Sequence, residues 1–168
     1  MLIGTEVALT DMLICRERRA YKQQEYLEKY HRPLISFCMN IPGPIKTTFE
    51  IRHAFEEGKT EILNALTDKG FAILDSDEIH ATTGDELIFC IDCQDAHLLK
   101  DIATQIEETH PLGRLFDIDI IDVDGTKLSR SSFRKCLICD RQAQDCAASR
   151  RHSVEEMQTA LWQMLTHY

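Results

Sequence analysis

The chain lacks long apolar runs and a secretory leader. No stretch of its 168 residues approaches the about 20 consecutive apolar residues that a membrane-spanning helix requires. Its first residues, MLIGTEVALTDMLICRERR, also lack the basic, apolar and small-residue segments that follow one another in a secretory signal. We therefore expect a cytoplasmic protein without a membrane partner.

Positive charge is also scarce. The chain has 19 lysines and arginines against 28 aspartates and glutamates, a net charge of −9 at pH 7. General nucleic-acid binding needs a basic surface that neutralises phosphates, so nucleic acid is not an expected partner. Residues 126–152 are the exception, because they hold seven basic and two acidic residues and carry +5. This basic block indicates either a confined anion site or a patch for an acidic partner, although a merely solvated segment would have the same composition.

Internal repeats, low-complexity tracts and linkers are absent as well. Hydrophobic residues make up 43% of the chain and charged residues 28%, as in soluble globular proteins. A chain of this length can bury one substantial core. We expect a single domain that covers residues 1–168.

The order of sequence patterns predicts an α+β fold. Periodicity and turn signals predict helices at 6–30, 47–69 and 95–109 and strands at 34–41, 71–81, 86–92 and 114–123. Residues 127–130 could return as a short strand, and a capping box at Ser153 and Glu156 opens a last helix that ends near Thr166. Without its ends, this order is the ferredoxin-like βαββαβ core, with an added N-terminal helix and a C-terminal helical, cysteine-rich extension. In that topology the first and last strands are antiparallel neighbours.

Two helices have apolar positions that suggest a buried face. In the helix at 47–69 these positions are Phe49, Phe55, Ile62, Leu63 and Leu66. In the helix at 6–30, Leu13, Ala20 and Leu27 repeat every seven residues and define an apolar stripe. Arg16 and Gln23 are a small rotation away from this stripe, and Arg19 is at its edge. The arginines either extend their heads to water or direct a guanidinium at a phosphate or carboxylate.

The strand at 114–123 contains the pair Asp117 and Asp119. Residues two apart on a strand share a face, so both carboxylates point away from the apolar residues between and beside them. Adjacent carboxylates repel each other unless a cation is bound between them, and Mg²⁺ typically combines one or two carboxylates with substrate phosphates. The pair indicates either a Mg²⁺ site or a solvated acidic strand, and Asp122 and Asp124 are second choices.

The loop that follows the first strand reads NIPGPIK. Its glycine, Gly43, permits close approach of the backbone to a ligand, and Lys46 offers a point charge for phosphate. The spacing of a Walker phosphate-binding loop is absent. The topology places this loop beside the first aspartates of the last strand.

Seven cysteines occur, an odd number, and a disulfide scaffold is not expected in the cytoplasm. Cys15, Cys38 and Cys90 lie singly among apolar residues and are interpreted as reduced core thiols. The other group consists of Cys136, Cys139, Cys146 and His152. Its spacing is compatible with a structural, tetrahedral Zn²⁺ site, or with reduced thiols beside a free histidine.

Four stretches together resemble one known family. They are CRERRAYKQ in the first helix, PLISFCMNIPGPIK at the first strand, GRLFDIDIIDVDGTKLSR at the last strand and RKCLICDRQAQDCAASRRHSVEEM after it. In this order, over nearly the whole chain, they are similar to the apo-citrate lyase phosphoribosyl-dephospho-CoA transferases, also called holo-citrate lyase acyl-carrier-protein synthases.

The resemblance implies a nucleotidyltransferase-type reaction. A serine of the apo acyl carrier subunit of citrate lyase attacks the innermost phosphate of triphosphoribosyl-dephospho-CoA, and pyrophosphate leaves. Such a displacement needs its triphosphate charge neutralised and its reactants held in line. Residue type and spacing assign catalysis and Mg²⁺ binding to Asp117 and Asp119. The expected substrate-binding residues are Arg16, Arg19, Gln23, Asn40, Gly43, Lys46, Arg130 and Arg134.

One departure limits what can be transferred from other nucleotidyltransferases. Many of them have a Gly-Ser turn shortly before the acidic pair, and no such turn precedes Asp117. Their fold and metal geometry are therefore not carried over. The alternative function is a non-catalytic, zinc-containing module that docks on the lyase complex or on another acidic partner.

Overall fold

The computed structural model describes residues 2–168 and has the α+β composition that the sequence predicts. The helices are α1 (Leu9–Tyr30), α2 (Phe49–Lys69), α3 (Ala96–Thr109), α4 (Ala143–Ala148) and α5 (Val154–His167). The strands are β1 (Leu34–Met39), β2 (Ala72–Ala81), β3 (Gly84–Asp92) and β4 (Phe116–Ile121), with a 3-10 turn at Gly113–Leu115. No helix among the described residues is long and apolar enough to span a membrane.

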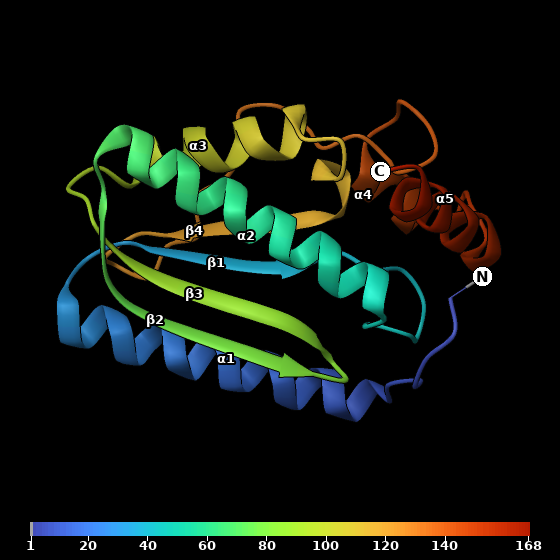
Figure 1. The fold of residues 1–168 in the computed structure, drawn as a ribbon, viewed down its shortest axis with the longest axis horizontal. Coiled ribbons are helices and arrows are strands. Elements are labelled where there is room, and N and C mark those ends of the chain that lie inside the picture. The colour runs from blue at the N-terminus through green and yellow to red at the C-terminus, as the bar shows by residue number, and fades with distance from the viewer. Residues whose placement is uncertain (1) are drawn as a thin grey trace.

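The four strands form one antiparallel sheet in the order β2-β3-β1-β4. Helices α2 and α3 cover one face of this sheet, and α1 lies across the other (Figure 1). Strands β1 and β4 are antiparallel neighbours, with Cys38 opposite Asp117 and Ser36 opposite Asp119. The expected adjacency of the first and last strands is confirmed, so the loop after β1 begins beside the start of β4.

The face under α2 and α3 holds the main apolar core. Phe37 of β1 stacks on Phe55 of α2 at a centroid distance of 4.9 Å, and Phe116 of β4 meets Phe37 edge-on at 5.6 Å. Helix α2 comes close to the sheet at Gly58, where an added Cβ would lie 2.5 Å from the Phe37 ring. These contacts fix the strand ends that carry the polar residues of the opposite face.

The buried face of α1 differs from the expected one. Leu13 and Ala20 are exposed, whereas Cys15 and Tyr26 are buried together with Leu27. The helix is rotated because its polar residues, rather than the seven-residue repeat, bind the sheet: Arg19 pairs with Glu86 of β3. The expectation that Leu13 and Ala20 line the apolar stripe was wrong.

The expected stripe on α2 also needs a correction. Phe49 is 85% exposed, because it lies on the side of α2 opposite to Ile51, which is two residues further on and is buried. Phe55, Ile62 and Leu66 are buried as expected, and Leu63 is half-buried. The buried positions that were not anticipated are Ile51, Ala54 and Gly58.

Most element boundaries shift by a few residues. The last strand is shorter than expected, because its first residues form the 3-10 turn and its end gives way to a turn at Asp122–Gly125. The return strand is reduced to one bridge between Ile121 and Lys127. The capping box of Ser153 and Glu156 at the start of α5 is confirmed. Helix α4 was not predicted.

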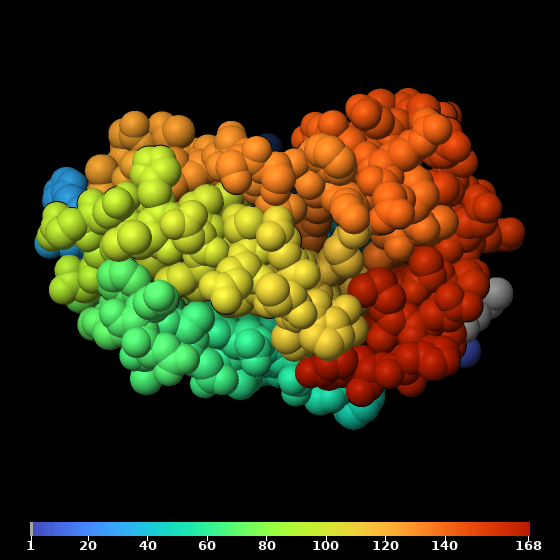
Figure 2. Space-filling view, turned by 90° about the horizontal axis from the view of Figure 1, so that it is seen from above, coloured from blue at the N-terminus to red at the C-terminus, as the bar shows by residue number. Residues whose placement is uncertain are grey.

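The connecting segment, residues 122–153, joins β4 to α5 and contains α4. It runs along one side of the molecule, and α5 closes one end next to α2 and α3 (Figure 2). Within this fully described range, the only buried residues are Cys136 and Cys146. A stretch this long with two buried residues cannot be held by a hydrophobic core of its own.

Candidate active site

The aspartate pair lies on the α1 side of the sheet, on the face opposite the apolar residues of β4, as the alternation along this strand predicts. Along β4, Phe116, Ile118 and Ile120 are buried towards α2 and α3, while Asp117 and Asp119 are half-buried on the opposite face. Adjacent charges of the same sign would destabilise this arrangement without a nearby cation.

A lysine supplies that cation. The Lys127 ammonium lies 2.5 Å from Asp119 Oδ2, and the bridge between Ile121 and Lys127 places it there. Burial, followed by the charge of Asp117, raises the pKa of Asp119 above its ordinary value. The carboxylate pair therefore needs a neighbouring positive charge, which Lys127 or another cation can supply.

Glu86 at the start of β3 anchors α1 next to this pair. Its side chain is 7% exposed and accepts hydrogen bonds from Arg18 at 2.5 Å and from Arg19 at 2.6 Å, and the Cys15 thiol donates to it at 2.8 Å. Arg19 also approaches Cys38 at 3.7 Å, and Cys38 lies 3.8 Å from Asp117. Arg19 is thereby held beside the aspartates.

A cavity of 390 Å³ collects these groups and the loop after β1. Its lining includes Arg16, Arg19, Asn40, Lys46, Asp117, Asp119 and Lys127. Lys46 donates to the Ile41 carbonyl oxygen at 2.7 Å. This hydrogen bond holds its ammonium next to the start of the loop. Burial, with a smaller contribution from Arg16, lowers the pKa of Lys46. Cations and carboxylates that face one space can hold a polyphosphate together with a divalent metal.

A second cavity of 520 Å³ opens on the other side of the same aspartates. It is lined by Asp117, Asp119 and Lys127 and also by Lys100, Glu107 and Arg130. Burial lowers the pKa of Lys100 and raises that of Glu107, which accepts a hydrogen bond from the Ile118 backbone at 2.9 Å. Arg130 lies 3.6 Å from Glu107 and 3.1 Å from Glu108.

The predicted substrate-binding residues fall into three groups. Arg16, Arg19, Asn40 and Lys46 share the first cavity with the aspartates. Gln23 lines an adjoining cavity with Arg16, Arg19 and Asp119, and donates to Ser36 at 3.0 Å. Arg130 and Arg134 line the second cavity. Gly43 lies apart, where an added Cβ would meet Gln158 of α5 at 2.4 Å.

Hydrogen bonds of Arg134 attach the connecting segment to the start of β4. Its guanidinium donates to the carbonyl oxygens of Arg114 at 2.9 Å and of Phe116. In return, Arg114 donates to the carbonyl oxygens of Lys135 and Cys136. These reciprocal contacts hold the connecting segment one residue away from Asp117.

Three site residues were not singled out from the sequence. Glu86 follows Asp85 at the start of an apolar strand, and Lys100 interrupts the buried face of α3. Lys127 follows the Asp-Gly turn at the distance where a returning chain meets the strand again. The sequence therefore holds a local signal for each of the three residues, but the residues that each one contacts are decided by tertiary packing.

The predicted zinc ligands converge. One ligand atom from each of Cys136, Cys139, Cys146 and His152 lies within 4.8 Å of all the others. The thiols of Cys139 and Cys146 are 3.6 Å apart, and His152 Nε2 lies 3.4 Å from Cys139 Sγ. Ligands bound tetrahedrally to one Zn²⁺ at ~2.0–2.3 Å lie roughly 3.3–3.8 Å from each other, and the separations of 3.6 and 3.4 Å match this spacing. All seven cysteines are free thiols.

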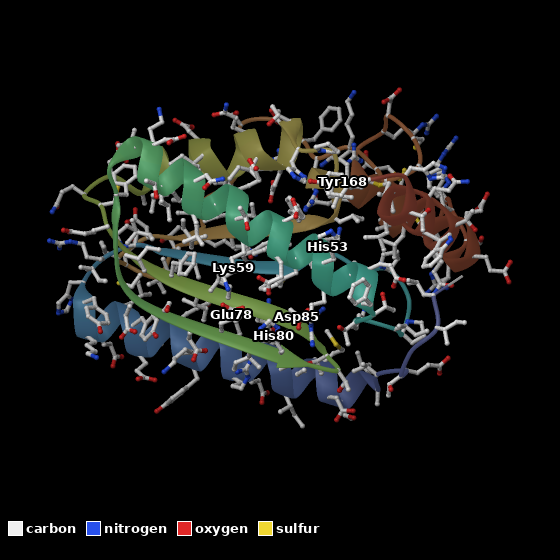
Figure 3. The ribbon with its side chains drawn as sticks, in the orientation of Figure 1. His53, Lys59, Glu78, His80, Asp85 and Tyr168 are labelled. Atoms are coloured by element: carbon white, nitrogen blue, oxygen red, sulfur yellow. The ribbon has the colours of Figure 1, made fainter. Side chains whose placement is uncertain are left out.

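A second titratable cluster, Glu56, Glu78 and His80, is satisfied by protein partners (Figure 3). Lys59 pairs with Glu78 at 2.6 Å, and His80 Nδ1 lies 2.8 Å from the buried carboxylate of Asp85. Its charges are already compensated, which suits a structural role over the β2–β3 hairpin.

Known proteins are similar to this chain over nearly its whole length. Residues 7–168 match the family model described as "Apo-citrate lyase phosphoribosyl-dephospho-CoA transferase". A Vibrio cholerae protein named "Probable apo-citrate lyase phosphoribosyl-dephospho-CoA transferase" is 36% identical over 166 residues, which cover 96% of this chain and 93% of the relative. The chain belongs to this family.

Further relatives of this apo-citrate lyase phosphoribosyl-dephospho-CoA transferase family extend the match. Proteins from Citrobacter koseri and Escherichia coli that bear the family name are each 32% identical over 155 residues. These residues cover 90% of this chain and 84% of each relative. The resemblance stated from four sequence stretches is confirmed.

Proposed function

We propose that this protein transfers phosphoribosyl-dephospho-CoA from triphosphoribosyl-dephospho-CoA to a serine of the apo acyl carrier subunit of citrate lyase. The observation that carries the proposal is the pair Asp117 and Asp119, which faces two cavities lined by cations. The names of the relatives support the same activity. We assign the βαββαβ core to the ferredoxin-like class and treat residues 1–168 as one transferase domain.

The reaction is a nucleotidyltransferase-type displacement. The serine oxygen forms a bond to the innermost phosphorus, the bond from that phosphorus to the pyrophosphate oxygen breaks, and pyrophosphate leaves. We assign the serine proton to the Asp119 carboxylate, which lines both cavities. A base must be within hydrogen-bond reach of the hydroxyl, and the half-buried position of Asp119 at the edge of both cavities allows this.

Magnesium fits the donors that the aspartates offer. Asp117 and Asp119 provide hard oxygen ligands on one face, and the pair already attracts the Lys127 ammonium. Mg²⁺ bound there would neutralise charge on the reacting phosphate. Lys127 can remain close as a phosphate ligand, because its flexible side chain is 63% exposed.

The remaining cations divide between the two cavities. Lys46, Arg16 and Arg19 face the first cavity from the loop after β1 and from α1. Lys100, Arg130 and Arg134 face the second. We propose that the triphosphate extends past the aspartates between these groups, so that the leaving pyrophosphate keeps cationic partners on departure.

The cysteine cluster has a separate role in this proposal. Three thiols and one imidazole are soft and borderline donors, the set that structural zinc sites use. We propose that Cys136, Cys139, Cys146 and His152 bind one Zn²⁺. The ion would hold the connecting segment and thereby the contact of Arg134 with β4.

The decisive experiment is transfer to the apo acyl carrier subunit, followed by intact mass, with and without Mg²⁺. We expect Asp117→Asn and Asp119→Asn each to reduce the rate by at least ~100-fold, because charge stabilisation at the reacting phosphate is lost. Asp122→Asn is the matched control, since Asp122 follows β4 but lines none of the described cavities. Folded wild-type protein that adds no mass to the carrier would refute the proposed function.

A further inference from the structure

The largest described cavity lies beside the aspartate cavities, between the connecting segment and α5. It measures 640 Å³, within the ~300–1,000 Å³ range of small-molecule sites. Its apolar walls include Pro42, Leu137, Ala147, Val154 and Met157. Asp117, Asp119 and the arginines of α1 do not line this cavity. We therefore infer its ligand from the residues that do line it.

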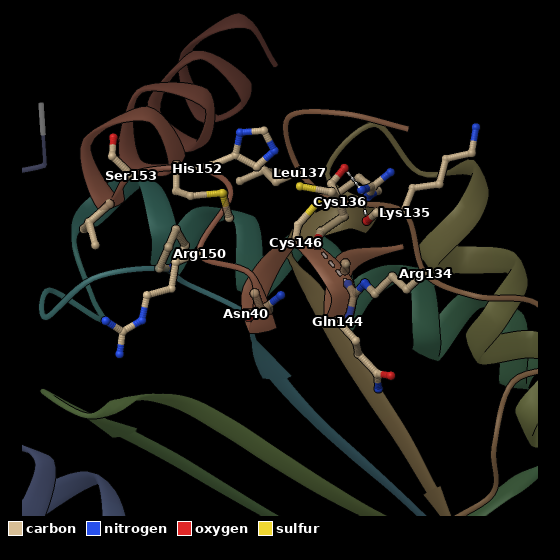
Figure 4. A pocket seen from close by; sticks show the side chains of 16 residues that line it. Asn40, Arg134, Lys135, Cys136, Leu137, Gln144, Cys146, Arg150, His152 and Ser153 are labelled. Carbon is tan, nitrogen blue, oxygen red and sulfur yellow. Dashed lines mark hydrogen bonds between the residues drawn. The ribbon is translucent and has the colours of Figure 1, made fainter. Parts of the chain in front are cut away.

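The cavity lining holds four cationic side chains and no carboxylate, and it also includes Cys136, Cys146 and His152, three of the proposed zinc ligands. Arg114, Arg134, Lys135 and Arg150 belong to the lining, and none of its 16 described residues is acidic (Figure 4). Arg114 and Arg134 are bound to backbone carbonyls and form part of the wall. Arg150 is exposed, and it takes part in none of the ion pairs of residues 2–168. An apolar cavity with a cationic rim suits a ligand that combines a flat apolar group with phosphates.

The backbone of Arg150 is unusual. Its φ is +47°, in the left-handed region that costs a residue with a side chain on the order of 1 kcal/mol and that favours glycine. Arg150 follows α4 as His31 follows α1, so this backbone conformation ends the helix and leaves the exposed side chain at the rim. Its neighbour Arg151 lines none of the described cavities, although it has the same charge.

The cavity adjoins the proposed reaction site, because it shares lining residues with both aspartate cavities. Asn40 lines both this cavity and the 390 Å³ cavity of Asp117 and Asp119. Arg134 and Gln144 line both this cavity and the 520 Å³ cavity. A ligand with its triphosphate at the aspartates can therefore extend past Asn40 or Arg134 into the apolar space.

We propose that this cavity binds the nucleotide part of dephospho-CoA, with the adenine against the apolar walls and the diphosphate at Arg150. This inference rests on the proposed function, in which the donor, triphosphoribosyl-dephospho-CoA, joins a nucleotide to the reacting triphosphate. Adenine matches the apolar residues of the lining, and the diphosphate matches its arginines and lysine. The cavity would then select donors by the moiety that does not react.

The test uses dephospho-CoA itself, which lacks the reacting triphosphate, with titration calorimetry on the full-length protein. Ala147→Trp should fill the cavity and weaken binding by at least ~10-fold, whereas Ala148→Trp, next on α4 and outside the lining, should leave it unchanged. Arg150→Gln should weaken binding about tenfold and Arg151→Gln should not, because of these two neighbouring arginines Arg150 lines the cavity and Arg151 does not. Circular dichroism of each variant establishes that it is folded.

The outcomes separate this inference from the proposed function. Equal affinity of Ala147→Trp, Arg150→Gln and wild type for dephospho-CoA overturns the cavity assignment, even where wild-type transfer is intact. Binding that depends on Ala147 and Arg150, in a protein that transfers nothing, supports the cavity and removes the proposed function. If these variants lose only the apo acyl carrier subunit, measured in a parallel titration, the cavity is a protein-docking surface and the nucleotide assignment is wrong.

Discussion

The sheet with α2 and α3 and the connecting segment are stabilised in different ways. The sheet region has a continuous apolar core in which Phe37, Phe55 and Phe116 are at most 1% exposed. The connecting segment has no such core: its only two buried residues, Cys136 and Cys146, are members of the cysteine cluster. Burial of apolar area can account for the first region but not for the second.

This difference explains how a poorly packed segment can support a cavity wall. Arg134 and Arg114 tie the segment to the start of β4 by hydrogen bonds to backbone carbonyls. Those bonds need the segment to keep one conformation, and a metal centre can impose it on a chain that buries little surface. The sheet supplies a rigid edge for the aspartates, and the connecting segment adds cations beside it.

The largest expected effect comes from removing one of the proposed zinc ligands. Cys146→Ser should lower the free energy of local opening of residues 122–153 by on the order of 5 kcal/mol or more, because structural zinc contributes ~10–16 kcal/mol in small metal-folded domains. Hydrogen exchange should then become fast in the connecting segment and stay slow in β1, β3 and α2.

The control for this variant is Cys93→Ser, a buried cysteine outside the cluster. Metal analysis should find about one zinc per chain in wild type and in this control, and clearly less in Cys146→Ser. Purified wild-type protein with no zinc, and with unchanged exchange after chelation, would show that the segment is held without metal.

The second effect belongs to the apolar core. Phe37→Ala should lower the free energy of global unfolding by about 3–5 kcal/mol, since it removes a fully buried ring that contacts Phe55, Phe116 and Gly58. Phe49→Ala, at an 85% exposed ring, should change it by less than ~0.5 kcal/mol. Denaturant unfolding measures both, and equal effects would contradict the assignment of the core.

The sequence predicted the sheet better than the helix faces. Alternation in FDIDI fixes which side of β4 carries the carboxylates, because a strand has a period of two regardless of its neighbours. A helix can rotate, and on α1 the pairing of Arg19 with Glu86 selected a face that the repeat of Leu13, Ala20 and Leu27 did not indicate. That pairing joins residues 67 apart in sequence, so periodicity could not predict it.

The metal ligands and the site cations show the same limit. The spacing of Cys136, Cys139, Cys146 and His152 is a local pattern, and the structure brings the four together as predicted. Lys100 and Glu86 reach the site only because α3 and β3 pack where they do. The roles of Arg130 and Arg134 remain predictions, since both now bind carboxylates or carbonyls of the protein.

The third and smallest effect concerns α1, which is held by charge as well as by apolar contacts. Glu86→Gln should lower the free energy of unfolding by about 1–3 kcal/mol, because the buried side chain loses its charge while Arg18 and Arg19 remain. Glu25→Gln on α1 is the matched control: its pairing with Lys22 is exposed and should contribute less than ~0.5 kcal/mol. Hydrogen exchange should rise in α1 and not in α2.

Because Arg19 lines the aspartate cavity, the KM for the donor should also rise in Glu86→Gln. A variant with normal exchange in α1 and normal KM would mean that the apolar contacts of Tyr26 and Leu27 hold this helix without help from Glu86.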